Sequence, residues 1–112
     1  MAFRTDLNAM ILGTLQAGPQ HGYQIVRTIR EAGGAPKLAE GQIYPYLHKL
    51  EETGLLTAEW QTDTGAAPRR VYELTKKGLK ELEHQRSAWE KFSQGVGAIL
   101  ATQARKPEKH HV

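Results

Sequence analysis

The chain lacks cysteine altogether, and it has no long hydrophobic run. Zero cysteines in 112 residues exclude disulfide bonds and thiolate metal sites, and they agree with a reducing compartment. No apolar stretch approaches the roughly 20 residues that a transmembrane helix needs, so no membrane partner is expected. The N-terminal sequence has no apolar signal segment either, and we therefore expect a cytoplasmic protein.

Motifs for catalysis and for cofactor binding are also missing. The chain has no Gly-rich phosphate loop and no histidine pair at metal-ligand spacing. Its carboxylates Glu40, Glu51 and Glu52 are interpreted as ordinary acids on a helix surface. We predict no metal, no cofactor and no enzymatic activity.

The whole chain has only a small excess of positive charge, but one segment is clearly basic. The formal net charge is only +3, from 15 basic and 12 acidic residues. Residues 68–80 hold one acid, Glu73, and five basic side chains, which is a local excess of the kind that neutralises phosphates. A solvated basic face without a partner is the alternative interpretation. The five basic residues are Arg69, Arg70, Lys76, Lys77 and Lys80.

Apolar periodicity predicts three helices in the first half of the chain, at about residues 6–17, 21–31 and 40–53. Asp6 supplies a capping acceptor for the first helix, and Gly18 with Pro19 ends it. Proline lacks an N–H group, so we expect Pro45 near the start of the third helix.

The second half predicts a hairpin and one long helix. Leu56, Ala58 and Trp60 alternate with polar residues as in a half-buried strand, and residues 70–74 form the returning strand after a turn at residues 63–68. Thr75 is the predicted N-cap of a final helix of roughly 27 residues, or about 40 Å. Glycines 95 and 97 predict that its distal part kinks or frays.

The third predicted helix has the composition of a helix that reads DNA. Ile43, Leu47 and Leu50 share one apolar face, which leaves polar and aromatic side chains on the other faces. The element order of three helices, two strands and a helix predicts a mainly α fold with a small β-hairpin, the winged helix-turn-helix. The outward side chains are Gln42, Tyr44, Tyr46 and Lys49.

Several segments together resemble the PadR transcriptional regulators, in the short form with a single C-terminal helix. The segments Ile11-Leu12-Gly13 and His21-Gly22-Tyr23-Gln24-Ile25 are similar to the family's opening. Gly41-Gln42-Ile43-Tyr44-Pro45 is similar to its recognition helix, and Arg69-Arg70-Val71-Tyr72 to its wing. The resemblance implies a homodimeric DNA-binding repressor whose C-terminal helices pair, in some members with a small aromatic or drug-like effector between the subunits.

Candidate DNA contacts follow from chemistry and from this resemblance. Gln42 can pair with adenine, while His48 and Lys49 can contact guanine or phosphate. The Tyr44 hydroxyl can reach a phosphate, or its ring can serve only in packing. The full predicted set is His21, Gly22, Tyr23, Gln42, Tyr44, Pro45, His48, Lys49, Arg69 and Arg70.

His21 and Gly22 have two interpretations. Free N–H groups at a helix start can hold a phosphate, and Gly22 would allow its close approach. Alternatively, the two residues only cap and pack the helix.

The final helix carries an apolar stripe that predicts a dimer interface, with an aromatic effector between the subunits as a compatible second use. The dimer and effector residues are Leu82, Trp89, Phe92, Val96 and Ile99. The expected organisation is a DNA-binding domain at 1–74, a dimerisation helix at 75–104 and a disordered tail at 105–112.

We therefore expect a sequence-specific regulator, a repressor of an inverted-repeat operator in double-stranded DNA. The alternative is a winged-helix module that uses the same faces to bind protein. A small-molecule carrier that uses the aromatic cleft is a further alternative. The sequence leaves open the operator, the regulated genes and the effector.

Overall fold

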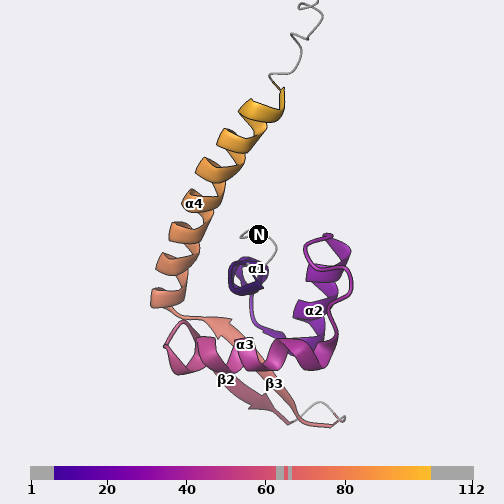
Figure 1. The fold of residues 1–112 in the computed structure, drawn as a ribbon. Coiled ribbons are helices and arrows are strands. Elements are labelled where there is room, and N and C mark those ends of the chain that lie inside the picture. Colours follow the sequence, from indigo (N-terminus) through magenta and orange to yellow (C-terminus); the bar gives the residue numbers. More distant parts are fainter. Residues whose placement is uncertain (1–6, 63–64, 66, 102–112) are drawn as a thin grey trace, which may run out of the picture.

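A computed structural model of the protein describes residues 7–62, 65 and 67–101. Figure 1 shows a small helical body with a β-hairpin at one end and a long helix that projects from the other end. This arrangement confirms the predicted winged helix-turn-helix. The elements are α1 (Leu7–Thr14), the 3-10 helix η2 (Leu15–Ala17), β1 (Gln20–His21), α2 (Gly22–Glu31), α3 (Glu40–Glu52), β2 (Leu56–Gln61), β3 (Arg69–Leu74) and α4 (Lys76–Ala101).

The core lies between the first three α-helices and the sheet. Branched aliphatic side chains from each layer meet there and are fully buried, and each stabilises the fold by about 1.5–3 kcal/mol relative to an exposed position. They include Ile11 and Leu12 of α1, Ile25 and Val26 of α2, Ile43 and Leu47 of α3, and Leu56 of β2. The apolar face predicted for α3 is therefore confirmed.

The first predicted helix is divided in the structure. It is α-helical only to Thr14 and tightens into a 3-10 turn at residues 15–17. Gly18 closes this turn with a bond from its N–H to the Leu15 carbonyl (3.2 Å), and its φ of 125° suits glycine. The predicted cap Asp6 lies outside the described residues.

A third strand was not predicted. β1 is two residues long, and it pairs with β3 through Gln20 opposite Tyr72 and His21 opposite Val71. The sheet order is β1-β3-β2, with all neighbours antiparallel. Two residues are too few to show a period of two, and their partner strand lies about 50 positions away, so no local pattern could reveal the pair.

The predicted position of Pro45 was only approximately right. The proline lies inside α3, which starts at Glu40, so it occupies the second turn and not the first. Its missing N–H leaves the Gly41 carbonyl without its usual helical donor. Gly41 and Pro45 are both exposed, so water can supply that donor.

The last helix is anchored to the wing base. Thr75 is its N-cap, as predicted, because its hydroxyl accepts from the Gly78 N–H (2.9 Å) and donates to the Gly54 carbonyl (2.7 Å). α4 then continues without a break to Ala101 (Figure 1), so the expected kink or fraying at residues 95 and 97 was wrong within the described part. Each glycine costs only about 1 kcal/mol relative to alanine, which the helical bonds on both sides tolerate.

Candidate nucleic-acid interface

A groove lies where the start of α2, the start of α3 and the loop end of the wing meet. Its volume is about 520 Å³, and polar, charged and aromatic side chains line it. Six predicted site residues come together here, although they are up to 49 positions apart in sequence. The six are His21, Gly22, Tyr23, Tyr44, Arg69 and Arg70. We call this feature the α2–α3 groove.

His21 connects the α2 terminus to the wing. Its Nδ1 faces the Gln24 N–H at 3.4 Å, and its Nε2 lies 3.0 Å from Arg69 Nη1. Burial, and secondly the charge of Arg69, lower the pKa of His21. A neutral imidazole has one acceptor nitrogen, so these two donors cannot both be satisfied at once. The shorter contact favours a lone pair on Nε2, which holds Arg69 at the edge of the groove.

Gly22 allows α2 and α3 to pack closely. A Cβ placed on Gly22 would lie 2.7 Å from the Tyr44 hydroxyl oxygen and 2.9 Å from two ring carbons. The glycine is buried beneath this ring. The close approach of the Tyr44 ring therefore supports the packing interpretation of Gly22. The neighbouring Tyr23 is 46% exposed.

The Tyr44 side chain packs through its ring and forms a polar contact through its hydroxyl. The ring covers Gly22, and the hydroxyl donates to Glu40 Oε2 at 2.8 Å. Burial, and secondly the Glu40 hydrogen bond, raise the pKa of Tyr44 to about 12. The hydroxyl therefore keeps its proton at neutral pH and remains a donor.

Gln42 is engaged at the start of its own helix. Its amide oxygen accepts from the Ala39 N–H at 2.8 Å. Pairing with adenine requires both that oxygen and the amide NH₂. Base reading by Gln42 would therefore need the cap to open, whereas a contact through the NH₂ group alone would not.

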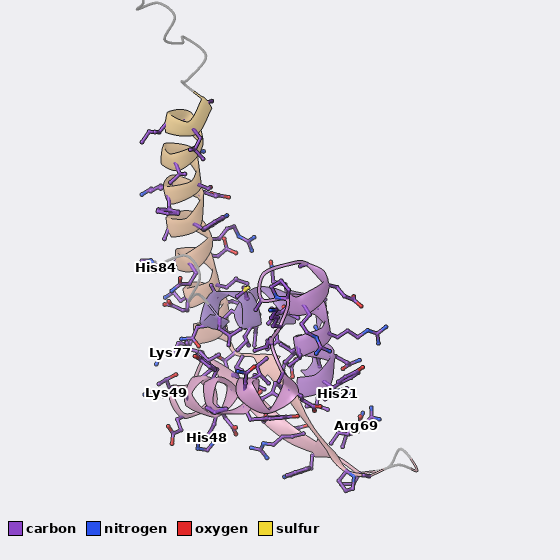
Figure 2. The ribbon with its side chains drawn as sticks, turned by 45° about the vertical axis from the view of Figure 1, so that its right-hand side comes forward. His21, His48, Lys49, Arg69, Lys77 and His84 are labelled. Atoms are coloured by element: carbon purple, nitrogen blue, oxygen red, sulfur yellow. The ribbon has the colours of Figure 1, made fainter. Side chains whose placement is uncertain are left out.

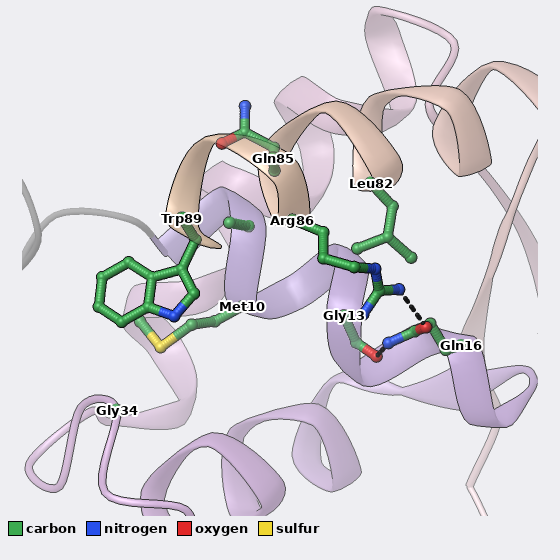
Figure 3. Close-up of a pocket in the computed structure, with 9 residues that line it drawn as sticks. Met10, Gly13, Gln16, Gly34, Leu82, Gln85, Arg86 and Trp89 are labelled. Carbon is green, nitrogen blue, oxygen red and sulfur yellow. Dashed lines mark hydrogen bonds between the residues drawn. The ribbon is translucent and has the colours of Figure 1, made fainter. Parts of the chain in front are cut away.

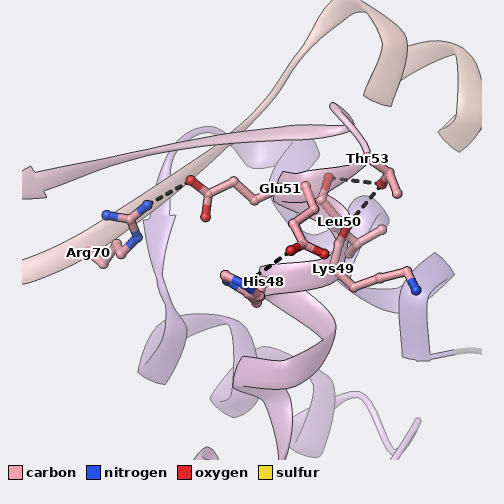
Figure 4. A network of polar contacts seen from close by, with 7 residues as sticks. His48, Lys49, Leu50, Glu51, Thr53 and Arg70 are labelled. Atoms are coloured by element: carbon pink, nitrogen blue, oxygen red, sulfur yellow. Dashed lines mark hydrogen bonds and ion pairs between the residues drawn. The ribbon is translucent and has the colours of Figure 1, made fainter.

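The two wing arginines have different surroundings. Arg70 Nη2 lies 2.7 Å from Glu51 Oε2, and its guanidinium stacks on the Trp60 ring with 5.5 Å to the centroid. Figure 4 shows this ion pair between β3 and α3. Arg70 therefore holds the wing against the recognition helix, and Arg69 is left beside the groove.

The predicted residues His48 and Lys49 lie at the other end of α3, away from His21 and Arg69 (Figure 2). His48 Nε2 lies 3.5 Å from Glu52 Oε2, and Lys49 is exposed. The basic stretch at residues 68–80 is also partly engaged, because Lys77 Nζ donates to the Thr53 carbonyl at the end of α3 (2.9 Å). The local charge excess therefore serves internal packing as well as any partner.

Glu40 and Trp60 line the groove and were missed from the sequence. Glu40 was interpreted as a surface acid, although its spacing of four residues from Tyr44 places both on one helix face. Trp60 was assigned to a half-buried face, but it is 60% exposed. β2 extends past the core at this point, which the alternating pattern alone could not show.

The predicted dimer and effector residues separate into two groups. Leu82 is only 4% exposed and belongs to the chain's own core, whereas four side chains further along α4 are exposed. The Trp89 and Phe92 rings lie 5.8 Å apart between centroids. The four exposed side chains are Trp89 (54%), Phe92 (44%), Val96 (39%) and Ile99 (74%).

A second cavity of about 390 Å³ lies between α1 and α4 (Figure 3). Met10, Leu82 and Trp89 form its apolar wall, and Arg86 Nη2 donates to Gln16 Oε1 (2.7 Å) across the two helices. No group of three His, Asp or Glu side chains suited to a metal occurs in the described part of the chain. Within the same residues, no helix has the length and apolarity to cross a membrane.

The fold and the groove define a winged-helix DNA-binding regulator of transcription. The model of the transcriptional regulator PadR-like family matches residues 11–84, and the chain belongs to this family. A transcriptional regulator of Mycobacterium tuberculosis is 36% identical over 76 residues, which cover 68% of this chain and 68% of that protein. The negative transcriptional regulator PadR of Bacillus subtilis is 35% identical over 77 residues, which cover 68% of this chain but only 42% of that longer protein.

Solved structures agree with this assignment. A PadR family transcriptional regulator from Eggerthella lenta superposes with a TM-score of 0.74 at 32% identity, over 88% of this chain and 85% of that one. A PadR-like transcriptional regulator from Bacillus cereus gives a TM-score of 0.76 at 26% identity, over 84% and 90%. The family and these relatives are regulators and not enzymes.

Proposed function

We propose that the protein is a homodimeric repressor that binds an inverted-repeat operator in double-stranded DNA. The observation that carries this proposal is the placement of two unlike surfaces at opposite ends of the molecule. The α2–α3 groove and the exposed side of α3 lie at one end, and an uncovered apolar stripe on α4 lies at the other. Residues 1–74 would bind DNA, and the helix that starts after Thr75 would join two copies.

The DNA-binding end has the chemistry that a duplex requires. In winged helix-turn-helix proteins the recognition helix enters the major groove with its first residues against base edges, and the wing meets the flanking backbone. Here α3 presents its N-terminal half beside the groove, with Arg69 at the wing side. Arg69 and the positive end of the α2 helix dipole would supply positive potential for phosphates. His48 and Lys49 would contact the duplex further along α3.

The apolar stripe on α4 supports a dimer. Large apolar side chains rarely remain exposed in a contiguous row unless a partner covers them. A two-fold axis would pair Trp89, Phe92, Val96 and Ile99 of one copy with the same residues of the other. Two recognition helices could then meet half-sites about one turn apart, ~34 Å along the duplex.

Release of the operator would occur through the same interface. A flat aromatic molecule between the two Trp89 rings would change the angle between the subunits and separate the recognition helices from their half-sites. The exposure of Trp89 and the cavity beside it support this step. The assignment as a repressor is supported by the Bacillus subtilis relative, which is named a negative regulator. Action at the chromosome would place the protein in the cytoplasm.

Selection of DNA fragments from a random pool by the purified protein tests the proposal. We expect a recovered palindrome, binding that weakens steeply with salt, and a dimer in sedimentation experiments at micromolar concentration. Adding planar aromatic compounds to the same selection identifies an inducer class by loss of recovery. A monomer that shows no sequence preference and no steep salt dependence would favour the protein-interaction module instead.

A further inference from the structure

One acidic side chain lies in a groove that is otherwise suited to phosphate. Among the described residues that line the α2–α3 groove, Glu40 is the one carboxylate, beside His21, Arg69 and Arg70. It is the first residue of α3, at the end of a recognition helix that approaches base edges. A negative charge at this position repels the DNA backbone, so its presence calls for an explanation.

Glu40 also accepts the Tyr44 hydrogen bond that a phosphate would need. The Tyr44 hydroxyl has a single proton, and it donates that proton to Glu40 Oε2 at 2.8 Å. Phosphate oxygens in DNA only accept hydrogen bonds. A phosphate can therefore bind the Tyr44 hydroxyl only after the Glu40 bond has broken, and the raised pKa of Tyr44 keeps the hydroxyl protonated for either acceptor.

The freed carboxylate would then stand at the start of α3 without its donor. Burial of an unpaired carboxylate against a duplex is costly, and a donor on a base edge can offset that cost. Base amino groups in the major groove are such donors, and the N4 amino group of cytosine is the usual partner of a glutamate. The cost of release thus arises on every duplex, whereas the compensation arises only where a suitable base lies opposite.

We propose that Glu40 is a specificity-determining residue that competes with DNA phosphates for the Tyr44 hydroxyl and, once displaced, reads a base amino group, most simply that of cytosine. The inference rests on the DNA-binding function proposed above. Glu40 thereby weakens binding to unrelated sequences and favours sequences with the matching base.

The test compares Glu40→Ala with wild-type protein on two duplexes of equal length. One is the duplex that the wild-type protein selects from a random pool, and the other has a scrambled sequence. We expect Glu40→Ala to bind the scrambled duplex about three- to tenfold more tightly, because the Tyr44 hydroxyl is then free to donate to a phosphate. We expect the ratio of selected to scrambled affinity to fall at least about fivefold, and a repeated selection with the variant to lose one base preference in each half-site.

Two controls separate the parts of the inference. Glu31→Ala removes a carboxylate at the far end of α2, where it pairs with Arg27, and corrects for net charge. Tyr44→Phe removes the contested proton, so adding Glu40→Ala to it should raise scrambled-duplex affinity by clearly less than Glu40→Ala does in the wild-type background. A full effect of Glu40→Ala in the phenylalanine background would overturn the competition.

Further outcomes are equally decisive. Equal changes on both duplexes, or no change beyond that of Glu31→Ala, would overturn the specificity role while wild-type DNA binding stands. If the wild-type protein itself selects no sequence, the proposed function fails, and that result is distinct from a failure at Glu40.

Discussion

Within the proposed DNA interface, Arg69 is the wing side chain that we expect to bind phosphate. Arg70 is held by Glu51 at 2.7 Å and stacks on Trp60, whereas Arg69 is exposed beside the groove and contacts the ring of a His21 whose pKa is lowered. A neutral imidazole leaves the guanidinium charge of Arg69 uncompensated. That charge is then available to a DNA phosphate.

Replacement of Arg69 by alanine should reduce operator affinity about 5- to 20-fold and lower the slope of log affinity against log salt by about 1, because one phosphate contact is lost. Fluorescence anisotropy between 50 and 200 mM salt, the range in which such slopes are commonly measured, would give both quantities. Arg27→Ala is the matched control, since Arg27 is exposed on α2 and pairs with Glu31. Parallel salt plots for Arg69→Ala and wild type would contradict the assigned role.

His21 should make folding stability depend on pH. Burial, and secondly the charge of Arg69, lower its pKa in the folded protein below the ordinary histidine value of about 6.5. As the pH falls below about 6.5, the unfolded chain binds a proton that the folded chain resists, so stability decreases until the folded-state pKa is passed. Above about pH 6.5 the contribution of His21 to folding stability is fully present.

Thermal melts of wild type and His21→Asn between pH 8 and 5 test this dependence. Asparagine is a favoured residue at the start of a helix but does not titrate. The wild-type melting temperature should fall more than that of the variant as the pH decreases through 6.5. Identical pH profiles of the two proteins would show that the pKa of His21 is not perturbed.

At the scale of elements, the position of α4 depends on one close backbone approach. The first turn of α4 packs on the loop after α3, and a Cβ on Gly78 would lie 2.1 Å from the Leu55 carbonyl oxygen. Backbone atoms cannot rotate away as a side chain can. The direction in which α4 leaves the body is therefore set by Gly78 together with the Thr75 cap.

Gly78→Ala should destabilise the protein by about 2–4 kcal/mol, because either the helix or the loop must shift. Gly95→Ala is the matched control in the same helix, where an added Cβ meets nothing within 4 Å. That control should be neutral or stabilise α4 by up to about 1 kcal/mol, through helix propensity. Urea unfolding measures both changes, and equal stabilities of the two variants would contradict the close contact.

At the scale of the whole molecule, the proposed function depends on how far apart two copies would hold their recognition helices. α4 has 26 residues and so a length of about 39 Å, comparable to one turn of DNA. Trp89, in the exposed stripe, lines the cavity beside α1, whereas Ile99 near the end of α4 is 74% exposed. A change at Ile99 should therefore affect dimerisation without affecting the folding of the body.

Ile99→Asp should shift the dimer toward monomer and weaken operator binding by at least about tenfold, because simultaneous contact with two half-sites is lost. Its far-ultraviolet circular dichroism should remain that of the wild type, since Ile99 is 74% exposed and remote from the core. Gln94→Asp, which adds the same charge on another face of α4, should leave sedimentation unchanged. A dimer that persists in Ile99→Asp would place the interface elsewhere.

Local patterns in the sequence predicted most of the fold. The burial of Ile43, Leu47 and Leu50, the cap at Thr75 and the order of the helices followed from periodicity and capping chemistry, which act over a few residues. β1 could not be predicted, because its two residues depend on β3 for their pairing. The candidate site was predicted as a set of residue types, and the contacts among them were not.

The sequence by itself determined which side chains of α3 point away from the core, because spacing along a helix fixes its faces. It also determined where α4 begins and which family the chain resembles. Only the tertiary structure decided that Arg69 meets His21, that Arg70 binds Glu51 and that Glu40 holds the Tyr44 hydroxyl within a groove shared by three elements. The first two contacts join elements far apart in the chain, and the groove around the third exists only once those elements pack. The choice of partner for each charge is therefore a property of the folded molecule.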